Sequence, residues 1–199
     1  MMIEPKHLAA RWLLAVVFVF SLGAGAAAQD TKDDTESEEA TYSENEIFQK
    51  ASSFFGSTTE GLAKAIEKVF EDQGRPNAFI AGEEVSGAFG IGVRYGDGML
   101  NRKAGGERKV YWQGPTIGFD FGADASKMFI LIYHLPDEKS LFQRFPAIDG
   151  SFYFVAGVGV NYQQSGDIIQ APIRTGVGLR AGINIGYMHY TEEFSWIPL

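Results

Sequence analysis

Five charged or amide side chains share one face of the strands predicted for this chain. They are Arg94, Asp120, Asn161, Arg180 and Asn184, and each has glycine neighbours two positions away or close by. Because glycine has no side chain, such neighbours would leave the polar groups unshielded. Two guanidinium groups can hold a phosphate or carboxylate through paired hydrogen bonds. The pattern therefore predicts an anionic-ligand site formed by Arg94, Asp120, Arg180 and Asn184.

The same residues also fit two structural interpretations without a ligand. An internal Arg–Asp pair could fix the register of the strands, since buried charges are normally paired. Alternatively, the side chains could lie on a solvated sheet face. The residue types alone leave these alternatives open.

A two-residue alternation positions these side chains. In residues 175–190, TGVGLRAGINIGYMHY, one set of alternate residues is apolar and the other is mostly glycine. A period of two is typical of β-strands, and similar alternation occurs near 89–95, 117–122 and 152–161. Glycine within strands suggests sharp curvature or the close approach of another backbone or a ligand. We predict a mainly β fold, a small curved antiparallel barrel or barrel-like sandwich of about ten strands.

Other chemistries have weaker support. GIGVRYGDG at 90–98 lacks the strand–turn–helix context of a dinucleotide loop and has no Walker lysine. His134 and His189 show no metal-ligand spacing, and no nucleophile elbow is present. We therefore expect neither an enzyme nor a cofactor.

The N-terminus predicts export. Residues 1–28 combine a basic start, the apolar run WLLAVVFVFSL and small residues before Gln29, as a cleaved signal peptide does. An acidic, disordered leader is predicted for 29–41. We expect a periplasmic protein with no transmembrane span after cleavage. The chain has no cysteine, and its net charge of -8 disfavours nucleic acid as a partner.

The mature chain divides into a helical segment, 42–76, and a β-barrel-like domain, 77–199. Ser43 and Glu46 fit a capping box, and Gly74 is a helix stop signal. Within the β domain, separate strands are predicted on either side of a tight turn at 96–98, and one strand is predicted over 151–162.

Two stretches carry a family resemblance, GIGVRYGDG at 90–98 and TIGFDFGADASKMFILIY at 116–133. They resemble the core signatures of the SYLF lipid-binding superfamily. With the signal peptide, the acidic leader and GVGLRAGINIGYMHY, residues 42–199 more closely resemble the alphaproteobacterial envelope integrity protein A family (DUF1134). That resemblance implies a small periplasmic barrel-like domain that supports cell-envelope integrity without an enzymatic site. The sequence leaves three kinds of partner open: a lipid, an envelope polymer or another periplasmic protein.

A small outer-membrane β-barrel is the alternative, because such proteins are also exported, rich in glycine and free of cysteine. The short predicted strands and the helical segment fit that alternative less well, since a membrane-spanning strand needs about 9–11 residues.

Overall fold

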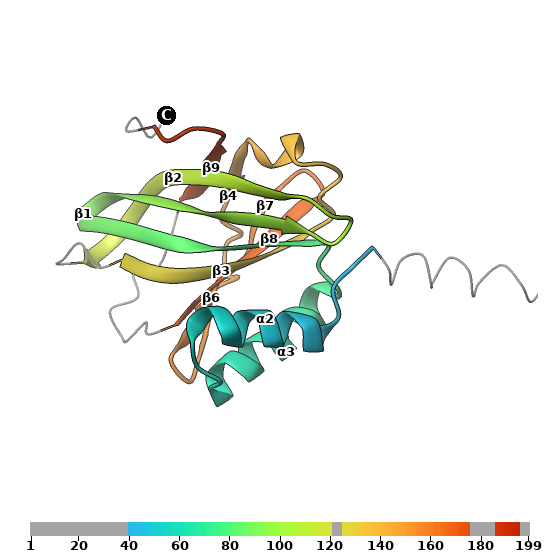
Figure 1. Cartoon of the computed structure of the whole chain (residues 1–199). Helices are drawn as coiled ribbons and strands as arrows, with labels where there is room; N and C mark the ends of the chain where they lie inside the picture. Colours follow the sequence, from blue (N-terminus) through green and yellow to red (C-terminus); the bar gives the residue numbers. More distant parts are fainter. Residues whose placement is uncertain (1–39, 121–124, 176–185, 196–199) are drawn as a thin grey trace, which may run out of the picture.

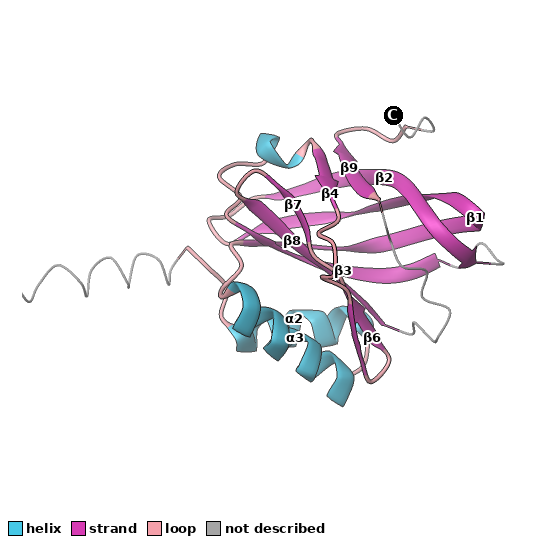
Figure 2. Ribbon diagram, turned by 180° about the vertical axis from the view of Figure 1, so that it is seen from behind, coloured by secondary structure: helices cyan, strands magenta, loops and turns pink. Residues whose placement is uncertain are grey.

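The computed structural model describes residues 40–120, 125–175 and 186–195. Its regular elements are α2 (Glu44–Phe55), α3 (Glu60–Gln73), β1 (Ala78–Arg102), β2 (Glu107–Asp120), β3 (Ala125–Tyr133), the 3-10 turn η1 (Lys139–Leu141), β4 (Arg144–Pro146), β5 (Tyr153–Val155), β6 (Val158–Val160), β7 (Gln163–Ser165), β8 (Ile168–Thr175) and β9 (Tyr187–Thr191). The strands form one nine-stranded antiparallel sheet, with α2 and α3 packed on one of its faces (Figures 1 and 2). The predicted mainly β fold class is confirmed.

Local sequence signals explain where the helices begin and end. Ser43 and Glu46 form the predicted capping box, in which each side chain bonds the other residue's backbone N–H. Thr59 caps α3 by accepting a hydrogen bond from the backbone of Leu62, and Gly74 ends that helix. Each helix then buries one apolar stripe, as an amphipathic helix on a sheet should.

The sheet runs in the order β4-β9-β2-β1-β3-β8-β6-β5, and β7 also pairs with β8. It curls so strongly that its two ends approach each other. Among the described residues, an isolated β-bridge joins Ala147, just after the edge strand β4, to Gln163 on β7, which pairs with β8 near the other end of the sheet. The curled sheet therefore encloses an inner face and presents an outer face.

Two apolar cores lie on opposite faces of this sheet. The outer core lies between the helices and the sheet, and it contains Ile47, Ile66, Phe79, Phe129 and Leu131. The inner core lies within the curl, and it contains Ile80, Leu100, Trp112, Ile130 and Met188. Strand β3 is buried on both sides, since its alternate residues belong to different cores.

The predicted turn at 96–98 is wrong, because these residues continue the 25-residue strand β1. Gly96 and Gly98 are needed for close packing. A Cβ at Gly96 would lie 2.1 Å from the Trp112 ring, and one at Gly98 would lie 2.7 Å from the Ala81 carbonyl oxygen. The chain reverses instead at residues 103–106, where Gly105 and Gly106 have positive φ.

The single strand predicted over 151–162 is also wrong. Ala156 and Gly157 both have positive φ, and Val155 pairs with Val158, so β5 and β6 form a hairpin with a two-residue loop. Thus glycine packs inside a strand at one place and makes a turn at the other, and the alternation alone does not distinguish the two uses.

The glycine-rich face of β1 is the inner one. Arg94 is fully buried there, whereas Val93 and Met99 on the opposite face are 39% and 38% exposed. The expectation that glycine neighbours leave Arg94 unshielded is therefore wrong, because the curl turns this face inward.

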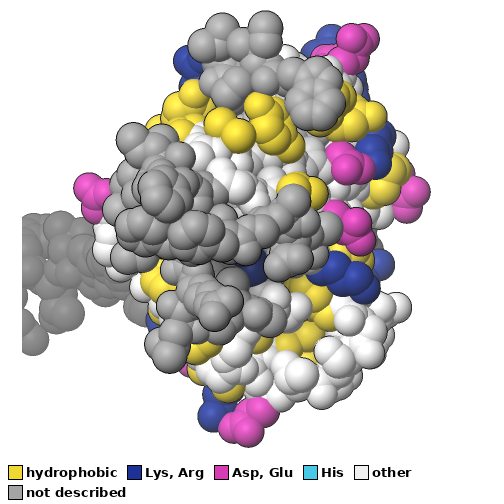
Figure 3. All heavy atoms as spheres, turned by 90° about the vertical axis from the view of Figure 1, so that its left-hand side faces the viewer, with side chains coloured by type: hydrophobic (Ala, Val, Ile, Leu, Met, Phe, Trp, Pro, Cys, Tyr) yellow, Lys and Arg dark blue, Asp and Glu magenta, His cyan; other side chains and the backbone are white. Residues whose placement is uncertain are grey.

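Figure 3, which views the end of the molecule on the left of Figure 1, shows apolar side chains exposed among charged ones.

Candidate functional site

Arg94 lies at the centre of a polar arrangement on the inner face. Its Nη2 donates a 2.9 Å hydrogen bond to the carbonyl oxygen of Tyr187. Strand β2 lies between β1 and β9, so Arg94 reaches past Gly114, its cross-strand partner on β2. A Cβ at Gly114 would lie 2.1 Å from the Tyr187 oxygen and 3.4 Å from Arg94 Nε. The absence of a side chain at Gly114 is thus what allows Arg94 and Tyr187 to meet.

A buried carboxylate, Glu84, provides the negative charge of this region. Its two oxygens accept hydrogen bonds from Arg174 Nη2 and from Trp112 Nε1, both at 2.8 Å. Glu84 and Arg174 come from β1 and β8, which are separated by β3 in the sheet. Both oxygens of Glu84 therefore have partners other than Arg94.

Burial and charge act in opposite directions on Arg94. Desolvation lowers the pKa of Arg94 to about 10, the Glu84 charge opposes this effect, and the Arg174 charge adds to it. The guanidinium remains protonated at neutral pH. The region therefore holds two cationic side chains and one anionic side chain among its described residues.

A second polar chain crosses the inner core. Tyr190 donates a 2.6 Å hydrogen bond to Gln170, which in turn bonds Gln163. Burial raises the pKa of the Tyr190 hydroxyl. This chain links β9, β8 and β7, where the two ends of the sheet come together.

Of the predicted site residues, the structure describes the side chain of Arg94. Asp120 ends β2, where its backbone pairs with Ala88. Arg180 and Asn184 lie outside the described residues. Asn161 is buried at 7% exposure, but no described hydrogen bond or ion pair connects it to Arg94. The anionic-ligand site thus stays a prediction.

Sequence reasoning missed Glu84, Trp112 and Arg174. The sequence did carry a signal for Glu84. It lies two positions after Gly82 and four after Ile80, so all three residues share the inward face of the strand. The pairing of Glu84 with Arg174 depends on strands 90 residues apart in sequence. No local pattern contains that contact.

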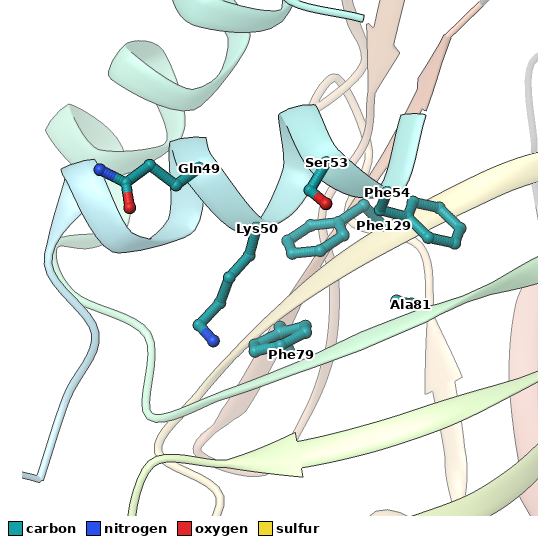
Figure 4. A pocket seen from close by; sticks show the side chains of 7 residues that line it. All are labelled: Gln49, Lys50, Ser53, Phe54, Phe79, Ala81 and Phe129. Carbon is teal, nitrogen blue, oxygen red and sulfur yellow. The ribbon is translucent and has the colours of Figure 1, made fainter. Parts of the chain in front are cut away.

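An open groove lies on the outer side of the sheet, beneath α2 (Figure 4). Its volume is about 390 Å³, and it is lined by Gln49, Lys50, Ser53, Phe54, Phe79, Ala81 and Phe129. The Phe79 and Phe129 rings stack with centroids 4.9 Å apart, and Phe54 lies 6.1 Å from Phe129. The floor of the groove is therefore aromatic.

Two lysine side chains, Lys50 and Lys127, lie over rings of this aromatic floor. Lys50 Nζ lies 5.5 Å from the Phe79 ring centroid and 5.7 Å from that of Tyr42. Lys127 lies over Phe54 and donates a hydrogen bond to its carbonyl oxygen. The groove combines apolar contact area with positive charge at its mouth, an arrangement that suits an anionic amphiphile.

The described part of the chain lacks both a metal-binding cluster and a membrane-spanning helix. Within 40–120, 125–175 and 186–195, no three His, Asp or Glu side chains converge in a way that could hold a metal ion. In the same ranges, no helix has the length and apolar character needed to cross a membrane.

Comparison with known proteins supports the predicted family. A crystal structure of a β-barrel-like protein from Brucella abortus is 44% identical, with a TM-score of 0.74 over 80% of this chain and 99% of that one. No functionally curated protein matches the chain. The profile described as envelope integrity protein A matches residues 40–199. The chain therefore belongs to the envelope integrity protein A family.

Proposed function

We propose that this protein is exported to the periplasm through residues 1–28 and supports the cell envelope by binding an anionic lipid, without catalysis. The family supplies the connection to envelope integrity. The groove beneath α2 is the observation that carries the lipid proposal. Its proposed occupant is the acyl chain of an amphiphile with a phosphate or carboxylate head.

The apolar part of the groove fits an acyl chain. The stacked Phe79 and Phe129 rings form the floor but are only 5% and 0% exposed, so the partly exposed Phe54 ring and Ala81 supply the accessible apolar surface. At about 390 Å³, the groove is near the lower end of ligand-site volumes, about 300–1,000 Å³. A single acyl chain lying along the floor of the groove suits this space better than a bulky ring system.

The polar part favours a negative head group. Lys50 is exposed and stands over Phe79 and Tyr42, where a bound head group would replace solvent around its ammonium. Gln49 and Ser53 add hydrogen-bonding groups on the same rim. An uncharged hydrocarbon would gain nothing from these three side chains.

The outer-membrane alternative has less support. α2 and α3 cover part of the outer sheet face, burying Leu131, Ala171 and Ile173 in protein rather than presenting them to lipid. Among the described residues, the inner face carries a second apolar core crossed by a few paired polar side chains, whereas the lumen of an outer-membrane barrel is polar.

The test starts with the full chain expressed with its leader and purified without detergent. Native mass spectrometry should show a co-purified amphiphile. Binding is then measured with a fluorescent long-chain fatty acid and with vesicles of phosphatidylglycerol or phosphatidylcholine. Ala81→Trp should block the groove and abolish binding, while Lys50→Glu should weaken it about tenfold or less.

Lys139→Glu is the matched control, since Lys139 is exposed on η1, away from the groove. It changes the net charge by the same amount and should leave binding unchanged. An adduct that persists in Ala81→Trp would place the ligand elsewhere. A carbohydrate adduct in place of a lipid would overturn the lipid assignment in favour of an envelope polymer.

A further inference from the structure

Arg94 presents hydrogen-bond donors that no described residue satisfies. Nη2 bonds the Tyr187 carbonyl oxygen, but Nε and Nη1 are buried without an acceptor. The whole side chain has no solvent exposure. A guanidinium in such surroundings normally has acceptors for most of its N–H groups, because an unpaired charged donor is expensive to bury.

The neighbouring positions offer no side-chain acceptors. Gly92 and Gly96 are the residues two positions away on the same face of β1, and Gly114 is the cross-strand partner. None of the three has a side chain. The glycine-rich pattern surrounds Arg94 with backbone and leaves its acceptors to come from elsewhere.

The charged side chains near Arg94 do not supply the missing hydrogen-bond acceptors. Glu84 interacts electrostatically with Arg94, but its carboxylate oxygens already bond Arg174 and Trp112. Arg174 acts on Arg94 as a like charge. Among the described side chains of this cluster, positive charge therefore exceeds negative charge by one.

We propose that Arg94 binds one small oxyanion, a phosphate or a carboxylate, on the inner face of the sheet. The anion accepts hydrogen bonds from Nε and Nη1 and balances the excess positive charge. The full burial of Arg94 favours a free ion or a small monoester over the head group of a membrane-embedded lipid. The site is separate from the groove beneath α2, which lies on the other face of the sheet.

The test uses the full protein titrated with inorganic phosphate, sulfate and acetate, each against sodium chloride of equal ionic strength. We expect a saturable rise in Tm above the chloride reference and a calorimetric stoichiometry of one anion per chain. Arg94→Gln should weaken this binding at least about tenfold, the loss expected for a charge-assisted hydrogen bond. Arg108→Gln, at a partly exposed arginine paired with Glu138 and Glu192, is the matched control and should bind as the parent does.

Two further measurements keep the test decisive if Arg94→Gln fails to fold. In the unaltered protein, the Nε–H resonance of Arg94 should move with anion concentration, and Arg94→Lys assigns that resonance. Glu84→Gln removes the competing negative charge and should tighten anion binding. Glycerol 3-phosphate and phosphatidylglycerol vesicles distinguish a small monoester from a lipid head group.

A protein that responds to phosphate, sulfate and acetate no more than to chloride overturns the proposal. Equal responses in Arg94→Gln and the parent also overturn it, since they indicate binding at the surface. Lys50→Glu should leave anion binding unchanged, so failure of this site is distinguishable from failure of the lipid groove.

Discussion

Arg174 Nη2 on β8 lies 2.8 Å from Glu84 Oε1 on β1, and strand β3 runs between them. The two side chains are 14% and 4% exposed. This ion pair therefore spans three neighbouring strands on the inner face. It holds together a curled sheet whose strands come from distant parts of the chain.

Loss of the Glu84 charge should destabilise the fold. Glu84→Gln leaves Arg174 buried without its counter-charge, and we expect the free energy of unfolding to fall by roughly 3 kcal/mol. Urea denaturation measures this change. The control is Glu60→Gln, which breaks the exposed pair of Glu60 with Lys64 on α3 and should have no measurable effect. Equal losses in the two variants would contradict the importance of burial.

Gly114 should not tolerate a side chain. A Cβ there would lie 2.1 Å from the Tyr187 carbonyl oxygen, so the acceptor of Arg94 would have to move. Gly114→Ala should lower the free energy of unfolding by about 2 kcal/mol or more. Gly87→Ala is the comparison, because a Cβ at Gly87 meets no atom within 4 Å. That variant should change stability by less than about 1 kcal/mol, and a similar loss in both would refute the steric argument.

Two buried tyrosines should respond oppositely to removal of their hydroxyls. Tyr133 OH has no hydrogen-bond partner among the described residues, and burial raises its pKa. Tyr133→Phe should therefore be neutral or stabilising by up to about 1 kcal/mol. Tyr190→Phe removes the 2.6 Å bond to Gln170 and should cost about 1–2 kcal/mol. Thermal denaturation of the two variants side by side tests this order, and a destabilised Tyr133→Phe would contradict it.

The capping box should make stability depend on pH in the acid range. Hydrogen bonds from Lys103 and Ser43 lower the pKa of Glu46 from 4.5 to about 2. The unfolded chain therefore binds the Glu46 proton more readily than the folded chain, so stability rises with pH in this window. The contribution of Glu46 should be complete above pH 4.5 and be lost as the pH falls towards 2.

Glu46→Gln should remove this dependence while retaining part of the cap. The measurement is the difference in unfolding free energy between parent and variant at several pH values. That difference should be constant above the unfolded pKa and shrink at lower pH. A difference that does not change with pH would show that the Lys103 and Ser43 contacts do not hold the carboxylate in its ionised form.

Local signals were sufficient for the elements that depend on local contacts. Ser43, Glu46 and Gly74 predicted helix ends because capping involves residues three or four positions apart. The two-residue alternation predicted a curved antiparallel sheet. Another backbone does approach closely at Gly98 and Gly114, but Gly98 was predicted to lie in a turn and Gly114 was not placed in a strand.

Tertiary structure decided which face of that sheet is inside. The alternation of Val93 and Arg94 indicates two faces, but curling buries the arginine and exposes the valine. The same packing distinguishes Gly96, which lies against Trp112, from Gly157, which makes a turn. The partners of Glu84 and the aromatic groove beneath α2 arise between segments distant in sequence. A single sequence establishes periodicity because that depends on neighbouring residues, whereas burial and pairing depend on how the whole sheet closes.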